Sequence, residues 1–288
     1  MKKMLTVVSV VAALGISASA FADTFILEGN YLKVGVSNSG GLIDDNFTVG
    51  IDYDKTGTKN WTTYDVLKPG TPRQFYSIGI GGSYRAAGYD SGNPFSATTT
   101  NTSAADMLSA LTLGSYLGLS FEQVISFNKD SGVIHYAVTL TNSGTSTLNN
   151  VSYATGFDPD QDVYAGGGYP TTNTLGADRV VAYAPVTEWG TAIVGDGVKS
   201  VDNVWDQNPY NLYNGGVDYN DGNGDYTINM AWLLGELEAG ASRTLYYDYA
   251  LGTDSSGHTD PVPEPSTLLL LGGGLAGLAF ARRRFVKK

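Results

Sequence analysis

The segment FEQVISFNKDSGVIHYAVTLTNSGTSTLNNVSYAT, residues 121–155, decides the fold class. Residues 121–127 read as a strand, and in 133–141 apolar Ile134, Tyr136, Val138 and Leu140 alternate with other residues, which is the period-two pattern of a half-buried strand. Turn-forming sequences at 128–132 and 142–146 separate these stretches from each other and from a third one at 148–155. The segment therefore predicts an antiparallel meander of three strands.

The same alternation recurs on both sides of this segment, and we find no fixed-period repeat. Only Ser103–Leu117 looks capable of forming a helix, and Gly114 interrupts it. We expect an all-β, antiparallel β-sandwich over residues 23–252, whose strand order the sequence does not reveal. Further strands are expected at 32–36, 47–53, 228–234 and 245–249, and long loops at 82–102, 158–177 and 196–225.

Composition excludes several classes of protein. The chain has 288 residues, no cysteine, two histidines, 37 glycines and 19 tyrosines. Without cysteine there is no disulfide framework, no thiol nucleophile and no cysteine-ligated zinc or iron–sulfur centre. A net charge of −11 makes nucleic acid an unfavourable partner. The profile is typical of an extracellular β-rich protein with many tight turns.

The N-terminal 22 residues have the three parts of a secretory signal peptide. Lys2 and Lys3 precede an apolar run at 5–16, and Ala20-Phe21-Ala22 forms a small-residue cleavage site for signal peptidase. The alternative is a membrane anchor, but the apolar run is shorter than the roughly 20 residues that a spanning helix needs. We expect cleavage that leaves Asp23 as the mature N-terminus.

The C-terminal end also has three parts in a fixed order. Pro263-Glu264-Pro265 precedes an apolar stretch at about 268–281, which we expect to form a single transmembrane helix. A cluster of cations, Arg282-Arg283-Arg284 together with the two terminal lysines, follows as a stop-transfer signal that remains cytoplasmic. The two prolines hold the chain extended. Residues 253–262, rich in Ser, Thr and Asp, are expected to be a flexible linker to this 263–288 segment.

This arrangement resembles the PEP-CTERM sorting signal of Gram-negative bacteria. The resemblance is confined to the tail and rests on motif, apolar helix and arginine cluster occurring together. It implies recognition by an exosortase, a membrane transpeptidase that removes the tail, and a location at the cell surface or in the extracellular matrix, among exopolysaccharide and biofilm components. A permanent single-pass membrane anchor is the alternative.

Removal of both ends makes the remaining body more acidic than the whole chain. Seven of the 17 cations and one of the 28 acids, Glu264, lie in the two terminal signals. The body therefore keeps 10 cations and 27 acids, a net charge of −17. A field of this sign repels anionic polymers and attracts divalent cations.

Two acidic loops are candidate calcium sites, because alternating carboxylates on a turning backbone can converge on one hard cation. The first contains Asp158, Asp160 and Asp162, and resembles the first half of an EF-hand loop, although Tyr169 stands where that loop has its bidentate glutamate. The second contains Asp221, Asn223 and Asp225, with Trp232 at the corresponding position. Exposed acidic turns are the alternative for both loops.

Catalytic signals are weak, and we expect no enzyme. His135 lies on the polar face of its strand, His258 lies in the linker, and no nucleophile elbow, zinc-protease motif or phosphate-binding loop is present. Carboxylates at Glu188, or at Glu236 with Glu238, are the visible options for a polysaccharide-active enzyme.

Aromatic residues in the glycine-rich loops favour binding over catalysis. Trp189, Trp205 and Tyr210 are the candidates, and flat rings beside Asn and Asp, as at Trp205 and Tyr210, are what a sugar-binding surface requires. Ordinary packing of these rings is the alternative. The sequence therefore predicts an exported structural or exopolysaccharide-associated component, with a carbohydrate-binding module and a polysaccharide-active enzyme as the two rivals.

Overall fold

The computed structural model describes residues 25–61, 65–88, 92–216, 222–254 and 257, and these residues form β-sheets almost throughout. The hairpin expected at 121–141 is present as β8 (Leu119–Asn128) and β9 (Val133–Asn142), which pair antiparallel. Side chains of β8 alternate between the core and the surface, so that Phe121, Ile125 and Phe127 are buried. The all-β prediction is confirmed.

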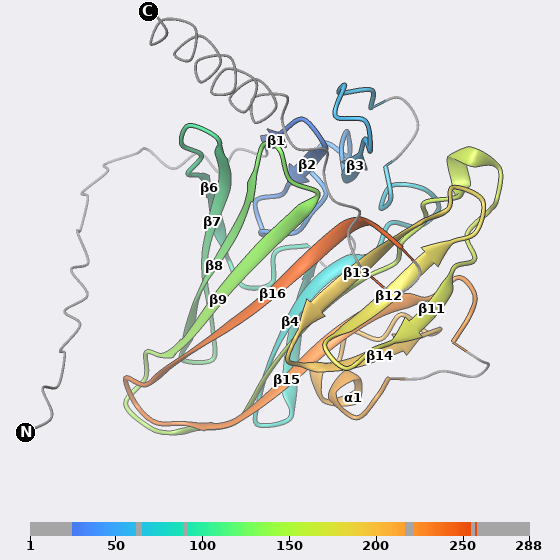
Figure 1. Cartoon of the computed structure of the whole chain (residues 1–288). Coiled ribbons are helices and arrows are strands. Elements are labelled where there is room, and N and C mark those ends of the chain that lie inside the picture. The colour runs from blue at the N-terminus through green and yellow to red at the C-terminus, as the bar shows by residue number, and fades with distance from the viewer. Residues whose placement is uncertain (1–24, 62–64, 89–91, 217–221, 255–256, 258–288) are drawn as a thin grey trace, which may run out of the picture.

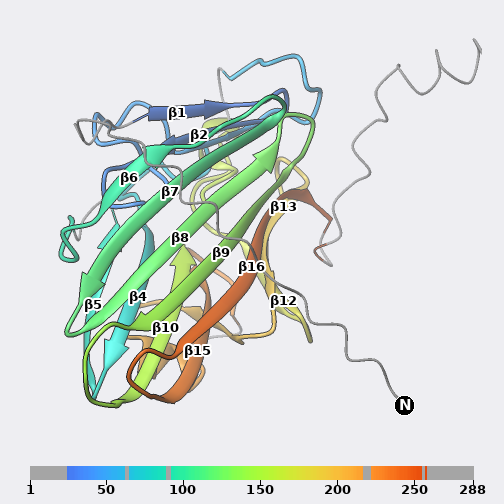
Figure 2. The same ribbon diagram turned by 90° about the vertical axis from the view of Figure 1, so that its left-hand side faces the viewer.

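Two large antiparallel sheets face each other across the core (Figure 1, Figure 2). The smaller has the order β14 (Val198–Asp202), β15 (Thr227–Leu237), β10 (Leu148–Phe157), β4 (Gln74–Ile80), β5 (Ser83–Gly88). The larger has the order β11 (Thr172–Leu175), β12 (Arg179–Ala184), β13 (Trp189–Gly195), β16 (Ser242–Thr253), β9, β8, β7 (Met107–Tyr116), β6 (Thr98–Asn101).

A third, small sheet joins the same core at one end of the sandwich (Figure 2). It consists of β1 (Phe25–Glu28), β2 (Leu32–Val36) and β3 (Ile51–Tyr53). Its buried contribution to that core consists of Leu27, Leu32, Val34, Val36 and Ile51. Of the stretch expected to be a strand at 47–53 only the last three residues are one, because Asp44 accepts hydrogen bonds from the backbone N–H groups of residues 46, 48 and 49 and Phe47 has a φ of 56°.

The predicted three-strand meander is wrong in its third strand. β10 does not pair with β9 but lies between β15 and β4 in the smaller sheet. After β9 the chain crosses from the larger sheet to the smaller one, and Asn142 lies at this crossing. Its Nδ2 donates to the carbonyls of Ser146 and of Leu237, the last residue of β15. The same turn residues serve a hairpin and a crossing between sheets, so the local sequence did not distinguish the two.

The predicted helix at Ser103–Leu117 is also wrong. Residues 107–116 form β7, which pairs with β8 along its whole length through a tight turn at Leu117 and Gly118. Both turn residues have positive φ, 47° and 84°, as a two-residue hairpin of this type requires. Pairing and burial of Ala110 and Thr112 outweigh the helix propensity of this Ala- and Leu-containing stretch.

Short elements occupy the three stretches that were expected to be long loops. They are β5 and β6 in the first, a 3₁₀ turn (η1, Val163–Ala165) and β11 in the second, and β14 and helix α1 (Pro209–Tyr213) in the third. Leu212 of α1 packs on Ala154 and Ala231, which explains why β10 is buried on both faces from Val151 onward. No helix within the described ranges is long and apolar enough to cross a membrane. The expected signal peptide and C-terminal helix lie outside those ranges.

Candidate functional site

Two acidic segments that are distant in the sequence meet at one end of the smaller sheet. Residues 158–162 follow β10, and residues 222–225 precede β15. Because β10 and β15 are antiparallel neighbours, with Phe157 opposite Ile228, the end of one strand and the start of the other share one edge. This register brings Asp225 to Asp158.

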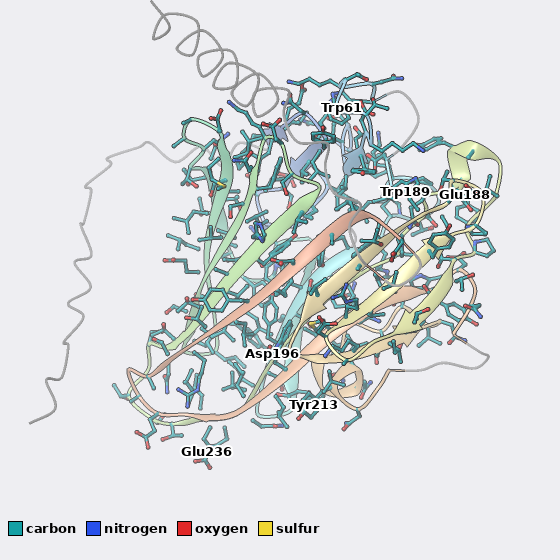
Figure 3. All side chains as sticks on the ribbon, in the orientation of Figure 1. Trp61, Glu188, Trp189, Asp196, Tyr213 and Glu236 are labelled. Atoms are coloured by element: carbon teal, nitrogen blue, oxygen red, sulfur yellow. The ribbon has the colours of Figure 1, made fainter. Side chains whose placement is uncertain are left out.

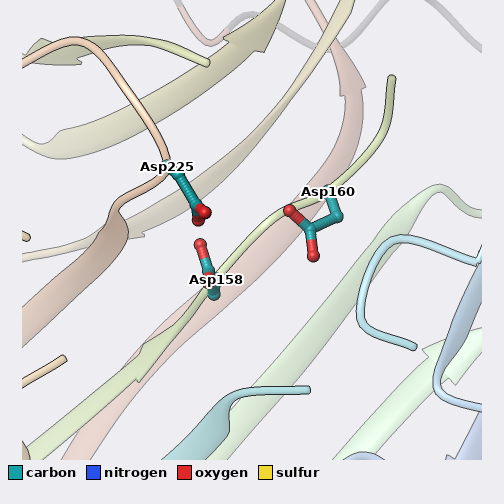
Figure 4. Close-up of side chains that lie close together, drawn as sticks. All are labelled: Asp158, Asp160 and Asp225. Atoms are coloured by element: carbon teal, nitrogen blue, oxygen red, sulfur yellow. The ribbon is translucent and has the colours of Figure 1, made fainter. Parts of the chain in front are cut away.

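Asp158, Asp160 and Asp225 form a cluster of carboxylates (Figure 4). One oxygen of each lies within 4.8 Å of one oxygen of each of the others. Asp158 and Asp160 are 5% and 2% exposed, whereas Asp225 is half-buried. The cluster therefore contains two residues of the first predicted calcium loop, Asp158 and Asp160, and one residue of the second, Asp225.

Burial makes the ionised form of these carboxyl groups unfavourable. It raises the pKa of Asp160 to about 9, and the charges of Asp158 and Asp225 add to the effect. Burial likewise raises the pKa of Asp158 to about 7, against the hydrogen bond from Trp205, and the pKa of Asp225 is raised as well. The side-chain hydrogen bond between Asp158 and Asp225 adds to the rise in the pKa of Asp158 and opposes the rise in the pKa of Asp225.

The cluster opens into a cavity of about 350 Å³. Trp205 forms one wall, and its Nε1 donates to Asp158 Oδ2 at 2.8 Å. Asp202, which is fully buried, positions this tryptophan by accepting hydrogen bonds from the backbone N–H groups of Val204 and Asp206 on either side of it. The remaining lining residues are Gly70, Thr71, Arg73, Tyr169, Asp160 and Asp225.

Arg73 is a site residue that no sequence motif predicted. It immediately precedes β4, and β4 pairs with β10 so that Gln74 lies opposite Phe157. The carbonyl of Arg73 consequently accepts a hydrogen bond from the backbone N–H of Asp158 at 2.9 Å. Only the strand order places Arg73 here, and no local motif around it indicated that order.

Two predicted calcium ligands have other partners, and a third lies outside the described residues. Asp162 accepts hydrogen bonds from the backbone N–H groups of Val186 and Thr187 at 2.8 and 2.7 Å, so it anchors the turn before β13 and does not join the cluster. Asn223 accepts a hydrogen bond from the backbone N–H of Asn173. Asp221 belongs to the part of the chain that is not described.

The three aromatic residues predicted to bind ligand are in three different places. Trp205 lines the cavity above the carboxylates. Trp189 lines a second cavity, also of about 350 Å³, beside Tyr53, with the two ring centroids 5.0 Å apart. The hydroxyl of Tyr210 donates to the carbonyl of Asn150 and accepts from the N–H of Gly82, which ties α1 to the smaller sheet.

The glutamates considered for catalysis are not brought together. Glu188 and Glu236 are exposed and lie at opposite ends of the molecule (Figure 3). Glu238 is exposed too, one residue beyond the end of β15. His135 is exposed and pairs with Asp248 at 2.7 Å, and this hydrogen bond raises the pKa of the histidine. None of these residues lines the carboxylate cavity.

Comparison with known sequences identifies the C-terminal tail. Residues 261–284 match the PEP-CTERM protein-sorting motif. This motif implies an exported protein that is processed by an exosortase and reaches the cell surface. A comparison with curated proteins found no matching sequence.

Solved structures show distant similarity to the body. An α-mannosidase from Enterococcus faecalis V583 aligns at 12% identity with a TM-score of 0.44, over 81% of this chain and 29% of the mannosidase. A TPR-domain containing protein from Parabacteroides distasonis aligns at 12% identity with a TM-score of 0.45, over 83% of this chain and 48% of that protein. A galactose mutarotase related enzyme from Lactobacillus acidophilus aligns at 10% identity with a TM-score of 0.45, over 83% of this chain and 99% of that enzyme. Similarity at this level carries no argument about activity.

Proposed function

We propose that this exosortase-processed protein is a non-catalytic surface or matrix component that binds exopolysaccharide, and that it does so in the cavity beneath Trp205. The observation that carries the proposal is the combination of an indole ring with buried carboxylates in one cavity. Its volume of about 350 Å³ lies within the range of small-ligand sites, about 300–1,000 Å³.

The lining supplies both kinds of contact that a sugar needs. Trp205 and Tyr169 offer ring faces against which the apolar side of a pyranose can pack. The carboxylates accept hydrogen bonds from hydroxyl groups, and the Arg73 guanidinium donates them. The strongly acidic body favours a neutral polysaccharide over a polyanionic one.

The binding prediction concerns Trp205. We expect Trp205→Ala to weaken binding of the producer's own neutral polysaccharide at least tenfold, which corresponds to about 1.4 kcal/mol, because the ring contact is lost. Binding is measured by pull-down and by titration of the purified protein. Trp189→Ala, in the second cavity, is the matched control and should bind like the natural protein. If both variants lost binding equally, or if neither lost it, this cavity would be ruled out as the binding site.

An enzymatic function is the second candidate, because buried carboxyl groups with raised pKa values are suited to acid–base chemistry. The same polysaccharide incubation decides between the two. Binding without release of reducing ends supports the proposal. Release that Asp158→Asn abolishes would instead make the cavity an active site.

A further prediction concerns processing of the tail. We expect the mature protein to end near Pro263, so that the apolar segment and the arginine cluster are absent from it. Mass spectrometry of the protein recovered from the cell surface measures this. Replacement of Pro263 and Pro265 by alanine should leave the tail attached. Recovery of the natural protein with residues up to Lys288 intact would show that the tail is a permanent anchor.

A further inference from the structure

The carboxylate cluster contains a buried acid, Asp160, one of whose carboxylate oxygens has no hydrogen-bond partner among the described residues. Asp160 is 2% exposed, and its Oδ1 has no partner within the described part of the chain. Figure 4 shows its carboxyl group directed toward Asp158 and Asp225. Burial of a carboxylate oxygen without a donor or a counter-ion is costly, so this oxygen is available to a ligand.

Four other buried aspartates of this protein are hydrogen-bonded by the backbone. Asp44, Asp65, Asp162 and Asp202 each accept two or more hydrogen bonds from backbone N–H groups. These four carboxylates are therefore satisfied by the protein itself. Asp160 differs from them because its neighbours are two further carboxyl groups.

Charge and space in the cavity match one divalent cation. The three carboxylates carry −3 when ionised and Arg73, which lines the same cavity, carries +1, which leaves −2. Ca²⁺ takes six to eight oxygen ligands at about 2.3–2.6 Å, and carboxylates with water complete such a shell. A cavity of about 350 Å³ holds the ion together with several waters.

We propose that Asp158, Asp160 and Asp225 form one calcium site at the floor of the cavity. The site combines ligands from the end of β10 with a ligand from the start of β15, in place of two separate loop sites. The inference does not rest on saccharide binding, because the cation alone is the ligand.

The test is titration of the metal-depleted protein with CaCl₂ alone, followed by calorimetry. We expect one Ca²⁺ per chain, and at least tenfold weaker binding in Asp160→Asn and in Asp225→Asn. Asp162→Asn and Glu236→Gln, which each remove one charge outside the cluster, should bind as tightly as the natural protein. Thermal melts in EDTA confirm that each variant is folded.

Terbium luminescence gives a second readout. Tb³⁺ takes calcium's ligands and is excited by a nearby indole, and Trp205 Nε1 lies 2.8 Å from Asp158 Oδ2. We expect Tb³⁺ emission that Ca²⁺ competes away and that Trp205→Phe reduces severalfold, with Ca²⁺ binding retained. The absence of both heat and emission at millimolar ion would overturn the proposal. If Asp162→Asn lost binding and Asp225→Asn did not, the calcium ligands would be Asp158, Asp160 and Asp162 of the continuous loop. Saccharide titrations with and without Ca²⁺ show separately whether the proposed function holds.

Discussion

Tyr153→Ala is expected to lower the free energy of unfolding by about 4 kcal/mol, which is typical of removing a large aromatic ring from a core. Tyr153 is fully buried on β10, where its ring centroid lies 5.9 Å from that of Trp232 and 6.2 Å from that of Tyr247. Tyr247 belongs to β16 in the opposite sheet. The ring therefore joins the two halves of the sandwich, and its loss leaves a cavity between them.

The hydroxyl of Tyr153 adds a smaller contribution. It is 2.9 Å from the hydroxyl of Tyr247 and donates to Gln123 Oε1 at 3.2 Å. Tyr153→Phe keeps the ring and should cost only about 1–2 kcal/mol, since it leaves buried polar partners with one hydrogen bond fewer. Chemical denaturation at constant pH measures both variants.

The matched control is Tyr246→Ala. This tyrosine neighbours Tyr247 in β16 but is 68% exposed on the outer face of the sheet, so its loss should change stability by no more than about 0.5 kcal/mol. Similar costs for Tyr153→Ala and Tyr246→Ala would contradict the packing of the two sheets through Tyr153.

Asp52→Asn is expected to stabilise the protein above neutral pH and to have little effect near pH 4. Burial first, and the charge of Asp65 second, raise the pKa of Asp52 to about 7, against the opposing charges of Lys33 and Lys68. Between pH 4 and pH 7 the folded protein keeps this proton while the unfolded chain, with an aspartate pKa near 3.8, has released it.

The sign of the effect follows from this difference. Because the folded state binds more protons, stability falls as the pH rises from about 4 to about 7, and the whole cost persists above pH 7. At about 1.4 kcal/mol per pKa unit, a rise from 3.8 to about 7 corresponds to a cost on the order of 4 kcal/mol. Asparagine does not ionise, so the difference between variant and natural protein should grow through this window and then level off. Urea unfolding at pH 4, 7 and 9 in EDTA measures it.

Asp54→Asn is the control, because the pKa of Asp54 is shifted in the opposite direction. Burial alone would raise the pKa of Asp54, but hydrogen bonds from Thr56, Asn60 and Thr58 outweigh it and lower the pKa to about 2. Its ionised form therefore stabilises the fold above about pH 4, and this contribution is lost only as the pH falls toward 2. Asp54→Asn should be destabilising at pH 7. A pH-independent difference between Asp52→Asn and the natural protein would show that the pKa of Asp52 is not raised in the folded state.

Individual strands were predictable because their pattern is local. The alternation through Phe121, Ile125 and Phe127 marks which residues of β8 are buried, whatever strand lies beside it. The strand at residues 107–116 was not predicted, because the apolar spacing there is compatible with both a helix and a strand. Pairing with β8 selects the strand. The pairing partner of β10 was likewise undetermined, since turn residues after β9 permit a hairpin or a crossing.

The sequence by itself determined the β class of this protein and the sorting motif at 261–284, because alternation and the order of a linear motif are properties of neighbouring residues. Only the tertiary structure decided which of the acidic residues share a cavity. Asp162 is two residues from Asp160 yet binds backbone amides elsewhere, whereas Asp225 reaches Asp158 from a remote segment. The physical reason is the antiparallel register of β10 with β15 and β4, which sets Asp225 and Arg73 beside the end of β10 and is fixed by packing between sheets.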